Sequence, residues 1–240
     1  MSWHTRRLAA FDLETTGIDV EHDRVVTAAV SVVGGGLPTA SRAWLVDPGV
    51  EIPAGASAVH GITTEQARRD GRDPAAAVEE ITAALAEQQL AGVPIVAFNA
   101  RFDLTILDRE ARRHGVVPLV ERIGGAERLL VVDPFVIDKQ VDRYRRGRRT
   151  LTAVCEHHRV PLVDAHDANA DALAAARVAW RMATSMIDIG GADLAELHRQ
   201  QVAWAAEQAA SLEEYFAAQG RPERVEGQWP CVLVAALAVA

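Results

Sequence analysis

Apolar runs without helical periodicity dominate the first part of the chain. Three of them favour strand formation, and they cover residues 7–13, 24–33 and 41–46. The second and third runs are joined by Gly34-Gly35-Gly36, with Pro38 close behind, which is typical of a hairpin loop. No helix start and no Gly-Lys-Ser/Thr pattern follows these glycines, so they predict a turn and not a phosphate-binding loop. The sequence therefore predicts an antiparallel meander.

Helical and strand-like runs alternate in the rest of the chain. Helices are predicted at residues 65–69, 74–89, 102–114, 150–158, 168–186 and 193–218, and strands at residues 94–98 and 129–132. In the second of these helices, Val78, Ile81 and Leu85 recur at helical spacing and mark one buried face. Strands that alternate with helices favour an α/β sheet with parallel members.

The composition matches a soluble globular protein with one large domain, or one domain with an appendage. The chain has 240 residues, of which 49% are hydrophobic and 24% charged. Its net charge of −8 argues against a protein that coats nucleic acid nonspecifically. The charge does not exclude a nucleic-acid enzyme, because acids that bind metal ions count as negative in this sum.

Cysteine usage and hydropathy predict the location of the protein. Cys155 and Cys231 are the only cysteines and lie far apart, so no disulfide framework is implied. No basic-then-apolar signal segment opens the chain, and a reducing cytoplasmic location is expected. The longest apolar stretch, residues 232–240, is about half of the roughly 20 residues that cross a bilayer. We therefore expect no transmembrane helix.

The first apolar run carries two acids, Asp12 and Glu14, where buried aliphatic residues are expected. Side chains two apart in a strand point to the same face, so these carboxylates project together just before a Thr-Thr-Gly turn. Ionised carboxylates are costly to bury unless they are paired or bound to a metal. Mg²⁺ is commonly held by one or two carboxylates, waters and substrate phosphates. The alternative is a strand end with two solvated acids.

Two further acidic positions precede or open helices. Asp103 follows the strand at residues 94–98, and ligand sites in open α/β sheets collect at the carboxyl ends of strands. By itself, Asp103 is typical of a helix N-cap. His166 lies before the helix at residues 168–186, and Asp171 lies about one turn inside it, so both can face one cleft. Taken alone, Asp171 is typical of an acid that complements the helix dipole.

Three motifs in this order carry a resemblance to a known family. Phe-Asp-Leu-Glu-Thr-Thr-Gly at residues 11–17, Asn-Ala-Arg-Phe-Asp at residues 99–103 and His-Asp-Ala-Asn-Ala-Asp at residues 166–171 resemble the three exonuclease motifs of the DEDD superfamily. His166 is the residue that distinguishes the DEDDh branch, so the chain resembles the DnaQ-like exonucleases of that branch. The resemblance implies a ribonuclease-H-like mixed sheet flanked by helices. We expect an exonuclease domain at residues 1–186, and the resemblance covers residues 7 to about 186 of it. Residues 187–240 lie outside the resemblance and are expected to form a helical C-terminal extension of unassigned role.

The resemblance also implies roles for individual residues. It implies that two Mg²⁺ or Mn²⁺ ions are held by Asp12, Glu14, Asp103 and Asp171, and that His166 is the general base. Substrate contacts are implied for Leu13, Thr15, Thr16, His60, Gly61, Ile62, Asn99 and Phe102. The segment at residues 60–63 resembles a loop that wedges against the terminal base. Phe102 in the core and His60 in a solvated loop are the alternative interpretations.

The implied activity is metal-dependent 3′-to-5′ hydrolysis of single-stranded DNA ends, releasing nucleoside 5′-monophosphates. The motif layout resembles the proofreading subunit of the bacterial replicative DNA polymerase, so DNA is favoured over RNA. A polymerase is then a candidate partner, docked through the helix at residues 193–218. One alternative is a 3′-to-5′ exoribonuclease on short RNA or tRNA ends, which differs from the DNA enzyme only in contacts to the 2′-OH. The other is a binding module in which catalysis is secondary.

Two clusters remain outside these motifs. Residues 143–149, Arg-Tyr-Arg-Arg-Gly-Arg-Arg, have the composition of a loop that binds backbone phosphates, and a solvated charged loop is the alternative. Cys155, His157 and His158 share one predicted helix without a second ligand pair, so a buried cysteine and exposed histidines are expected in place of a zinc site.

Overall fold

The computed structural model describes residues 2–163 and 165–234, and within them the strands form one five-stranded sheet in the order β3-β2-β1-β4-β5. The strands are β1 (Arg7–Thr15), β2 (Val25–Gly34), β3 (Ala40–Leu45), β4 (Ile95–Val96) and β5 (Val131–Val132). The first three are antiparallel neighbours, and β4 and β5 run parallel to β1. The predicted meander, the glycine turn and the parallel members of the sheet are confirmed.

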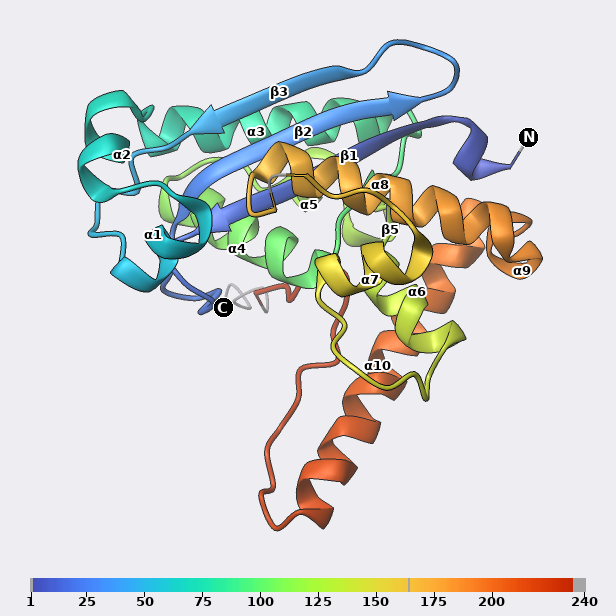
Figure 1. Cartoon of the computed structure of the whole chain (residues 1–240). Helices are drawn as coiled ribbons and strands as arrows, with labels where there is room; N and C mark the ends of the chain where they lie inside the picture. The colour runs from blue at the N-terminus through green and yellow to red at the C-terminus, as the bar shows by residue number, and fades with distance from the viewer. Residues whose placement is uncertain (1, 164, 235–240) are drawn as a thin grey trace, which may run out of the picture.

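The helices cover both faces of this sheet (Figure 1). They are α1 (Ala54–His60), α2 (Thr64–Asp70), α3 (Pro74–Leu90), α4 (Ala100–Arg113), α5 (Leu119–Arg122), α6 (Pro134–Val141), α7 (Leu151–His158), α8 (Ala168–Ser185), α9 (Ile187–Gly190) and α10 (Leu194–Ala218), with short 3₁₀ turns η1 (Trp3–Thr5) and η2 (Ala126–Arg128). The six predicted helices are all present. The prediction missed α1, α5, α6 and α9, which are too short to show a clear period.

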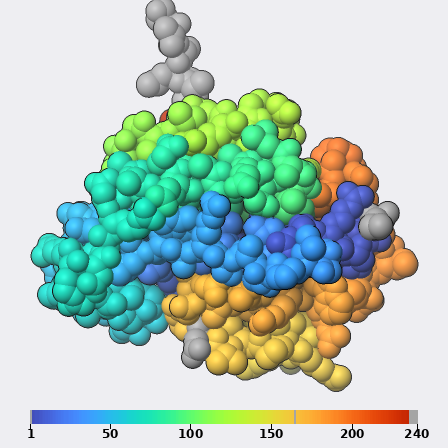
Figure 2. All heavy atoms as spheres, turned by 90° about the horizontal axis from the view of Figure 1, so that it is seen from above, coloured from blue at the N-terminus to red at the C-terminus, as the bar shows by residue number. Residues whose placement is uncertain are grey.

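Successive residues of β1 divide the core into two layers. Phe11 and Leu13 pack into the cluster that includes α3 and α4, whereas Leu8 and Ala10 pack into the cluster that includes α8. Figure 2 shows the strands between these two helical layers. Because side chains alternate along a strand, Asp12 and Glu14 continue the face that α8 covers.

The N-terminal half of α10 covers the β5 edge of the sheet. Leu197 and Gln201 are fully buried, and the Gln201 side-chain amide donates to the Val131 carbonyl at 3.0 Å. His198 Nδ1 accepts the Val131 N–H at 3.1 Å. These contacts satisfy the backbone N–H and carbonyl of Val131, which a neighbouring strand would otherwise pair. The C-terminal half of α10 extends away from the sheet, and the chain then returns beside it (Figure 1).

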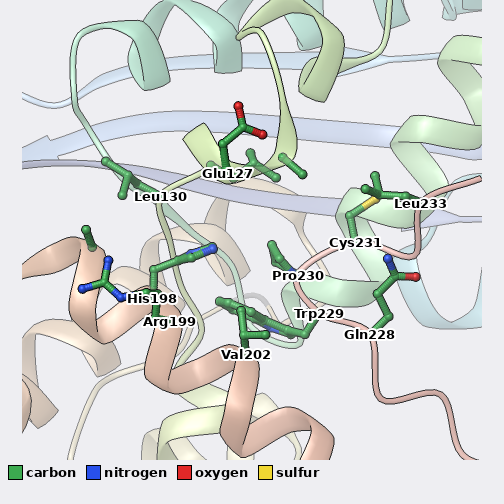
Figure 3. A pocket seen from close by; sticks show the side chains of 13 residues that line it. Glu127, Leu130, His198, Arg199, Val202, Gln228, Trp229, Pro230, Cys231 and Leu233 are labelled. Atoms are coloured by element: carbon green, nitrogen blue, oxygen red, sulfur yellow. The ribbon is translucent and has the colours of Figure 1, made fainter.

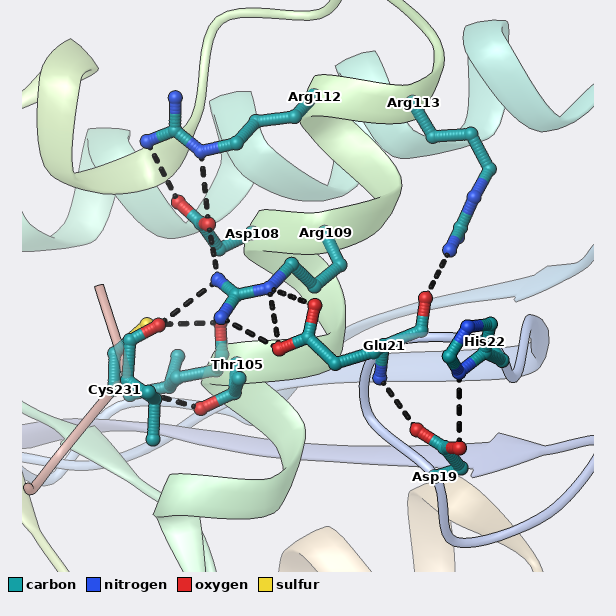
Figure 4. Close-up of polar contacts among 11 residues, drawn as sticks. Asp19, Glu21, His22, Thr105, Asp108, Arg109, Arg112, Arg113 and Cys231 are labelled. Carbon is teal, nitrogen blue, oxygen red and sulfur yellow. Dashed lines mark hydrogen bonds and ion pairs between the residues drawn. The ribbon is translucent and has the colours of Figure 1, made fainter. Parts of the chain in front are cut away.

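The returning segment is anchored on α4. Val232 N–H donates to Thr105 Oγ1 at 3.0 Å, and Arg109 Nη1 donates to the Val232 carbonyl at 2.9 Å. Arg109 also pairs with Glu21 and Asp108, which ties this segment to the loop after β1 (Figure 4). The predicted apolar run at residues 232–240 lies outside the described residues from 235 onward. None of the described helices is both long and apolar enough to span a bilayer.

A buried carboxylate, Asp138 on α6, organises the connection to α7. It accepts from Arg145 Nη1 at 2.7 Å, from Arg149 Nη1 at 2.5 Å and from His158 Nε2 at 3.2 Å. Burial raises the pKa of Asp138, but these hydrogen bonds outweigh burial and hold the pKa well below its usual range. His158 is therefore part of an ion-pair cluster with a side chain only 7% exposed, and its predicted exposure was wrong.

We expect Asp138→Ala to lower the free energy of unfolding by about 3–5 kcal/mol, because it leaves two arginines without their buried partner. Urea unfolding followed by circular dichroism measures this change. Asp188→Ala, at an exposed position on α9, is the matched control and should change stability by less than about 0.5 kcal/mol. Equal effects of the two substitutions would contradict an organising role for Asp138.

Candidate active site

Acidic residues lie near the end of β1, where the strand is no longer paired with β4. β4 pairs with β1 only at Ala9 and Ala10, so the N–H of Leu13 has no strand partner on that side. The Asp103 carboxylate accepts this N–H at 3.1 Å. Asp103 is 3% exposed and lies in the first turn of α4. It is not the N-cap, because α4 begins at Ala100 and Asn99 occupies the cap position.

Asp133, which follows β5, fixes the turn that delivers Asp103. Its two carboxylate oxygens accept the N–H groups of Asn99 and Ala100, both at 2.9 Å. Asn99 holds a left-handed backbone with φ of 63°, which is uncommon outside glycine. Burial raises the pKa of Asp133 to about 6. The prediction missed Asp133, although its place directly after a buried strand was a usable signal.

The start of α8 supplies the remaining groups. Asp167 caps the helix by accepting the Ala170 N–H at 2.9 Å, and Asp171 follows one turn inside with 8% exposure. His166 precedes the helix with φ of 70°, and its N–H donates to Asp171 Oδ2 at 3.2 Å. The predicted positions of His166 before the helix and Asp171 within it are confirmed. Such backbone strain persists where surrounding contacts impose it.

The structure brings Glu14, His166 and Asp171 together. Each of the three offers a ligand atom, and these atoms all lie within 4.8 Å of one another. Asp12 lies close enough to Asp103, Glu14 and Asp171 for their charges to act on it. Five groups from positions between 12 and 171 thus gather at one end of the sheet, with the His166 side chain exposed to solvent.

Burial and mutual repulsion raise the pKa values of these acids. Burial raises the pKa of Asp12 well above its usual range, and the charges of Asp103, Glu14 and Asp171 raise it further. Burial, followed by the charges of Asp171 and Asp167, raises the pKa of Glu14 to about 7. Both effects describe carboxylates that lack a compensating positive charge.

The donor set fits a hard divalent cation. Asp171 Oδ1 is buried and has no hydrogen-bond partner, which is costly for a carboxylate oxygen. Oxygen ligands with one imidazole nearby suit Mg²⁺ or Mn²⁺. In the part of the chain that the structure describes, Cys155, His157 and His158 form no such group, because the one candidate cluster is that of Glu14, His166 and Asp171.

The loop after α1 also lies beside this site. His60 is half-buried, and its pKa is lowered by burial and by the nearby His166, while the backbone of Thr15 opposes this. His60 Nδ1 accepts the Ile62 N–H at 3.2 Å, and Gly61 ends α1 with φ of 78°. Ile62 packs against a small separate cluster with Val26 and is only partly buried.

The other predicted substrate residues serve structural roles in part. Leu13 is a core residue, and Phe102 packs against the same cluster while partly exposed. Thr15 Oγ1 donates to the Gly17 carbonyl and Thr16 Oγ1 to Asp23, both at 2.6 Å, so both hydroxyl protons are used within the turn. Asn99 is half-exposed at the start of α4.

A cavity of about 480 Å³ at the β5 edge contains none of these acids (Figure 3). It lies between the start of α10 and the returning C-terminal segment, with His198, Val202 and Trp229 among its lining. The His198 and Trp229 rings lie 5.1 Å apart with their planes tilted by 45°, and His198 already accepts the Val131 N–H of β5. This cavity is therefore separate from the candidate active site.

Comparison with known structures gives the same fold. The exonuclease I of E. coli bound to a dT13 oligonucleotide matches with a TM-score of 0.62 at 20% identity over 76% of this chain. The exonuclease I of Methylocaldum szegediense matches with a TM-score of 0.60 at 21% identity over 77%. The matched region is 42% of each of those chains, so this chain corresponds to less than half of either.

Sequence comparison defines the family. No curated protein matches this chain. The family model described as Exonuclease (RNase_T) matches residues 9–179, a region that contains all five signature residues of the three motifs. The fold, the acidic cluster and this match agree, and the chain belongs to the exonuclease family.

Proposed function

We propose that this protein is a metal-dependent 3′-to-5′ exonuclease that releases nucleoside 5′-monophosphates from single-stranded DNA. The convergence of Asp12, Glu14, Asp103 and Asp171 beside His166 is the observation that carries this proposal. Single-stranded DNA is favoured because E. coli exonuclease I, which shares the fold, was solved with a dT13 oligonucleotide. Proofreading and repair are both compatible roles for such an activity.

The four acids would hold two Mg²⁺ or Mn²⁺ ions. When bound, such a pair orients and acidifies a water on one side of a phosphodiester and stabilises the departing 3′ oxygen on the other. The unpartnered Asp171 Oδ1 and the raised pKa of Asp12 support this assignment, because both are relieved by a positive charge.

His166 would accept the proton of the attacking water. The water oxygen bonds to phosphorus, the bond from phosphorus to the 3′ oxygen breaks, and the imidazole takes the proton that the water loses. The exposed imidazole can then return that proton to solvent. The hydrogen bond from His166 N–H to Asp171 fixes the backbone from which the ring projects.

His60, Gly61, Ile62 and Phe102 would contact the terminal nucleotide. His60 lies beside the Thr15 backbone and near His166, and part of the Phe102 ring remains exposed. Asn99, Leu13, Thr15 and Thr16 would contribute through backbone groups or the Asn99 side chain. A DNA polymerase that docks on α10 stays a prediction, as does the division into residues 1–186 and 187–240.

Product analysis on 3′-labelled single strands tests the proposal. We expect 5′-mononucleotides in Mg²⁺ or Mn²⁺, none in chelator, and loss of activity to background in Asp12→Ala and Asp171→Ala. His166→Ala should lower kcat by about 10²–10⁴-fold. His157→Ala, whose side chain is 44% exposed, is the matched control and should keep full activity.

The same assay on RNA of equal sequence and at matched salt separates the alternatives. Faster hydrolysis of DNA agrees with the proposal, and a large preference for RNA would establish the exoribonuclease instead. Unchanged activity and metal dependence in Asp12→Ala would exclude the proposed site and favour a binding module.

Glu14→Gln should change stability in a pH-dependent way. In chelator, the raised pKa of Glu14 favours the folded state fully below about pH 4.5, and this contribution is lost as the pH rises through about 7. The variant should therefore match wild type near pH 4.5 and be more stable by about 1–3 kcal/mol above pH 7. Mn²⁺ should reverse the order, because only the wild type keeps the full ligand set.

Thermal unfolding in chelator and in Mn²⁺, at several pH values, measures both differences. Glu87→Gln, exposed on α3, is the control and should follow wild type throughout. A Glu14→Gln variant that is less stable than wild type in chelator at pH 8 would show that these carboxylates do not repel one another.

A further inference from the structure

The arginines of the basic loop, residues 143–149, fall into two sets. Arg145 and Arg149 turn inward and pair with the buried Asp138 carboxylate, with shortest distances of 2.5 Å. The other three arginines, Arg143, Arg146 and Arg148, are exposed, and so is Tyr144. We call these four residues the outer set. Because the inner pair fixes the loop to α6, the outer side chains are presented from an anchored segment and not from a free tether.

Further cations connect this loop to the candidate active site. Arg149 Nη1 donates to the Asp138 carbonyl at 3.0 Å, next to Lys139 on α6, and Lys139 lines one cavity with Arg101. Burial lowers the pKa of Lys139, and the charges of Arg149 and Arg101 lower it further. Lys139 Nζ also lies 4.8 Å from the centre of the Phe135 ring. Arg101 is in the first turn of α4, two residues before Asp103.

A cavity accompanies this connection. It measures about 280 Å³, and Asn99, Arg101, Phe135 and Lys139 are among its lining residues. Arg101 in the first turn of α4 and Lys139 on α6 therefore share one cavity, and α6 leads directly into the basic loop.

The arginines and the exposed tyrosine of the basic loop have the chemistry that binds single-stranded nucleic acid. The whole protein has a net charge of −8, and its candidate active site is acidic, so a polyanion is repelled unless local cations attract it. Arginines bind backbone phosphates without regard to sequence, and an exposed aromatic ring stacks on bases. Tyr144 is 89% exposed, which leaves both faces of its ring open.

We propose that the outer set of the basic loop binds the substrate strand on the 5′ side of its cleaved end, with Lys139 and Arg101 between the loop and the active site. This inference rests on the proposed function, because it takes the strand terminus to lie at the acidic cluster. The loop then sets affinity for long strands, while the acids and His166 set the rate of hydrolysis.

The test compares two double variants with the same change in charge. Arg146→Ala/Arg148→Ala removes two outer arginines, and Arg6→Ala/Arg42→Ala removes two exposed arginines, one directly before β1 and one in β3. Both are made in an Asp12→Asn background, which prevents cleavage. Binding of a fluorescent 20-nucleotide oligo-dT is measured by anisotropy between 0.05 and 1 M salt, with thermal unfolding as a check that each variant folds.

Loss of two phosphate contacts to a single strand should reduce the slope of log Kd against log salt by roughly 1.4. This change in slope corresponds to roughly 25-fold weaker binding by the loop double variant than by its parent at about 0.1 M salt, with little difference at 1 M. The control pair should stay within about twofold of its parent, and Tyr144→Ala should weaken binding where Tyr144→Phe does not. Equal effects of the two double variants, or a slope that does not change, would overturn the inference.

Hydrolysis of a small chromogenic diester, bis(p-nitrophenyl) phosphate, separates this inference from the proposed function. With Asp12 intact, the loop double variant should hydrolyse the diester in Mn²⁺ at the wild-type rate, because this substrate is too short to reach the loop. A wild-type protein that hydrolyses neither the diester nor DNA would refute the proposed function. Normal hydrolysis with unaltered DNA binding in the loop variant would refute the loop assignment alone.

Discussion

Burial and mutual repulsion of the carboxylates at one end of the sheet impose a cost that shapes the rest of the fold. Asp12 and Glu14 follow the apolar run Leu8–Phe11 in β1, and Asp103 and Asp171 approach them from helices on opposite faces. Burial and mutual charge raise the pKa of Asp12 and Glu14, so the arrangement costs stability whenever no cation is present. Packing elsewhere has to offset that cost.

The surrounding contacts show how the fold holds these groups in place. Asp103 accepts the N–H of Leu13 where β4 has ended, so one carboxylate both completes the sheet and joins the acidic cluster. Asp133 holds the left-handed turn before α4, and His166 is held by its N–H to Asp171. Gln201 of α10 accepts the N–H of Asp133 at 2.7 Å, so the C-terminal helix supports the same turn from behind. The site therefore depends on residues from almost the whole described chain.

The sequence was most informative where period and spacing are local. Alternation in β1 predicted that Asp12 and Glu14 share a face, and the long helices show clear periods. A period is weak in one or two turns, so short helices were found unevenly: α2 and α7 were predicted, whereas α6 of similar length was missed. The role of Asp133 and the division of the arginines by Asp138 depend on partners that only the tertiary fold supplies. His158 was expected to be exposed because its partner Asp138 lies 20 residues earlier, on another helix, and local spacing does not indicate that contact.

Anomalous diffraction from crystals soaked in manganese chloride shows whether the four carboxylates seat divalent cations. We predict strong manganese peaks in direct contact with carboxylate oxygens of Asp12, Glu14, Asp103 and Asp171, and none at Cys155 or His158. A difference map without a peak among these four side chains, or with manganese bound only elsewhere, would exclude the proposed metal site.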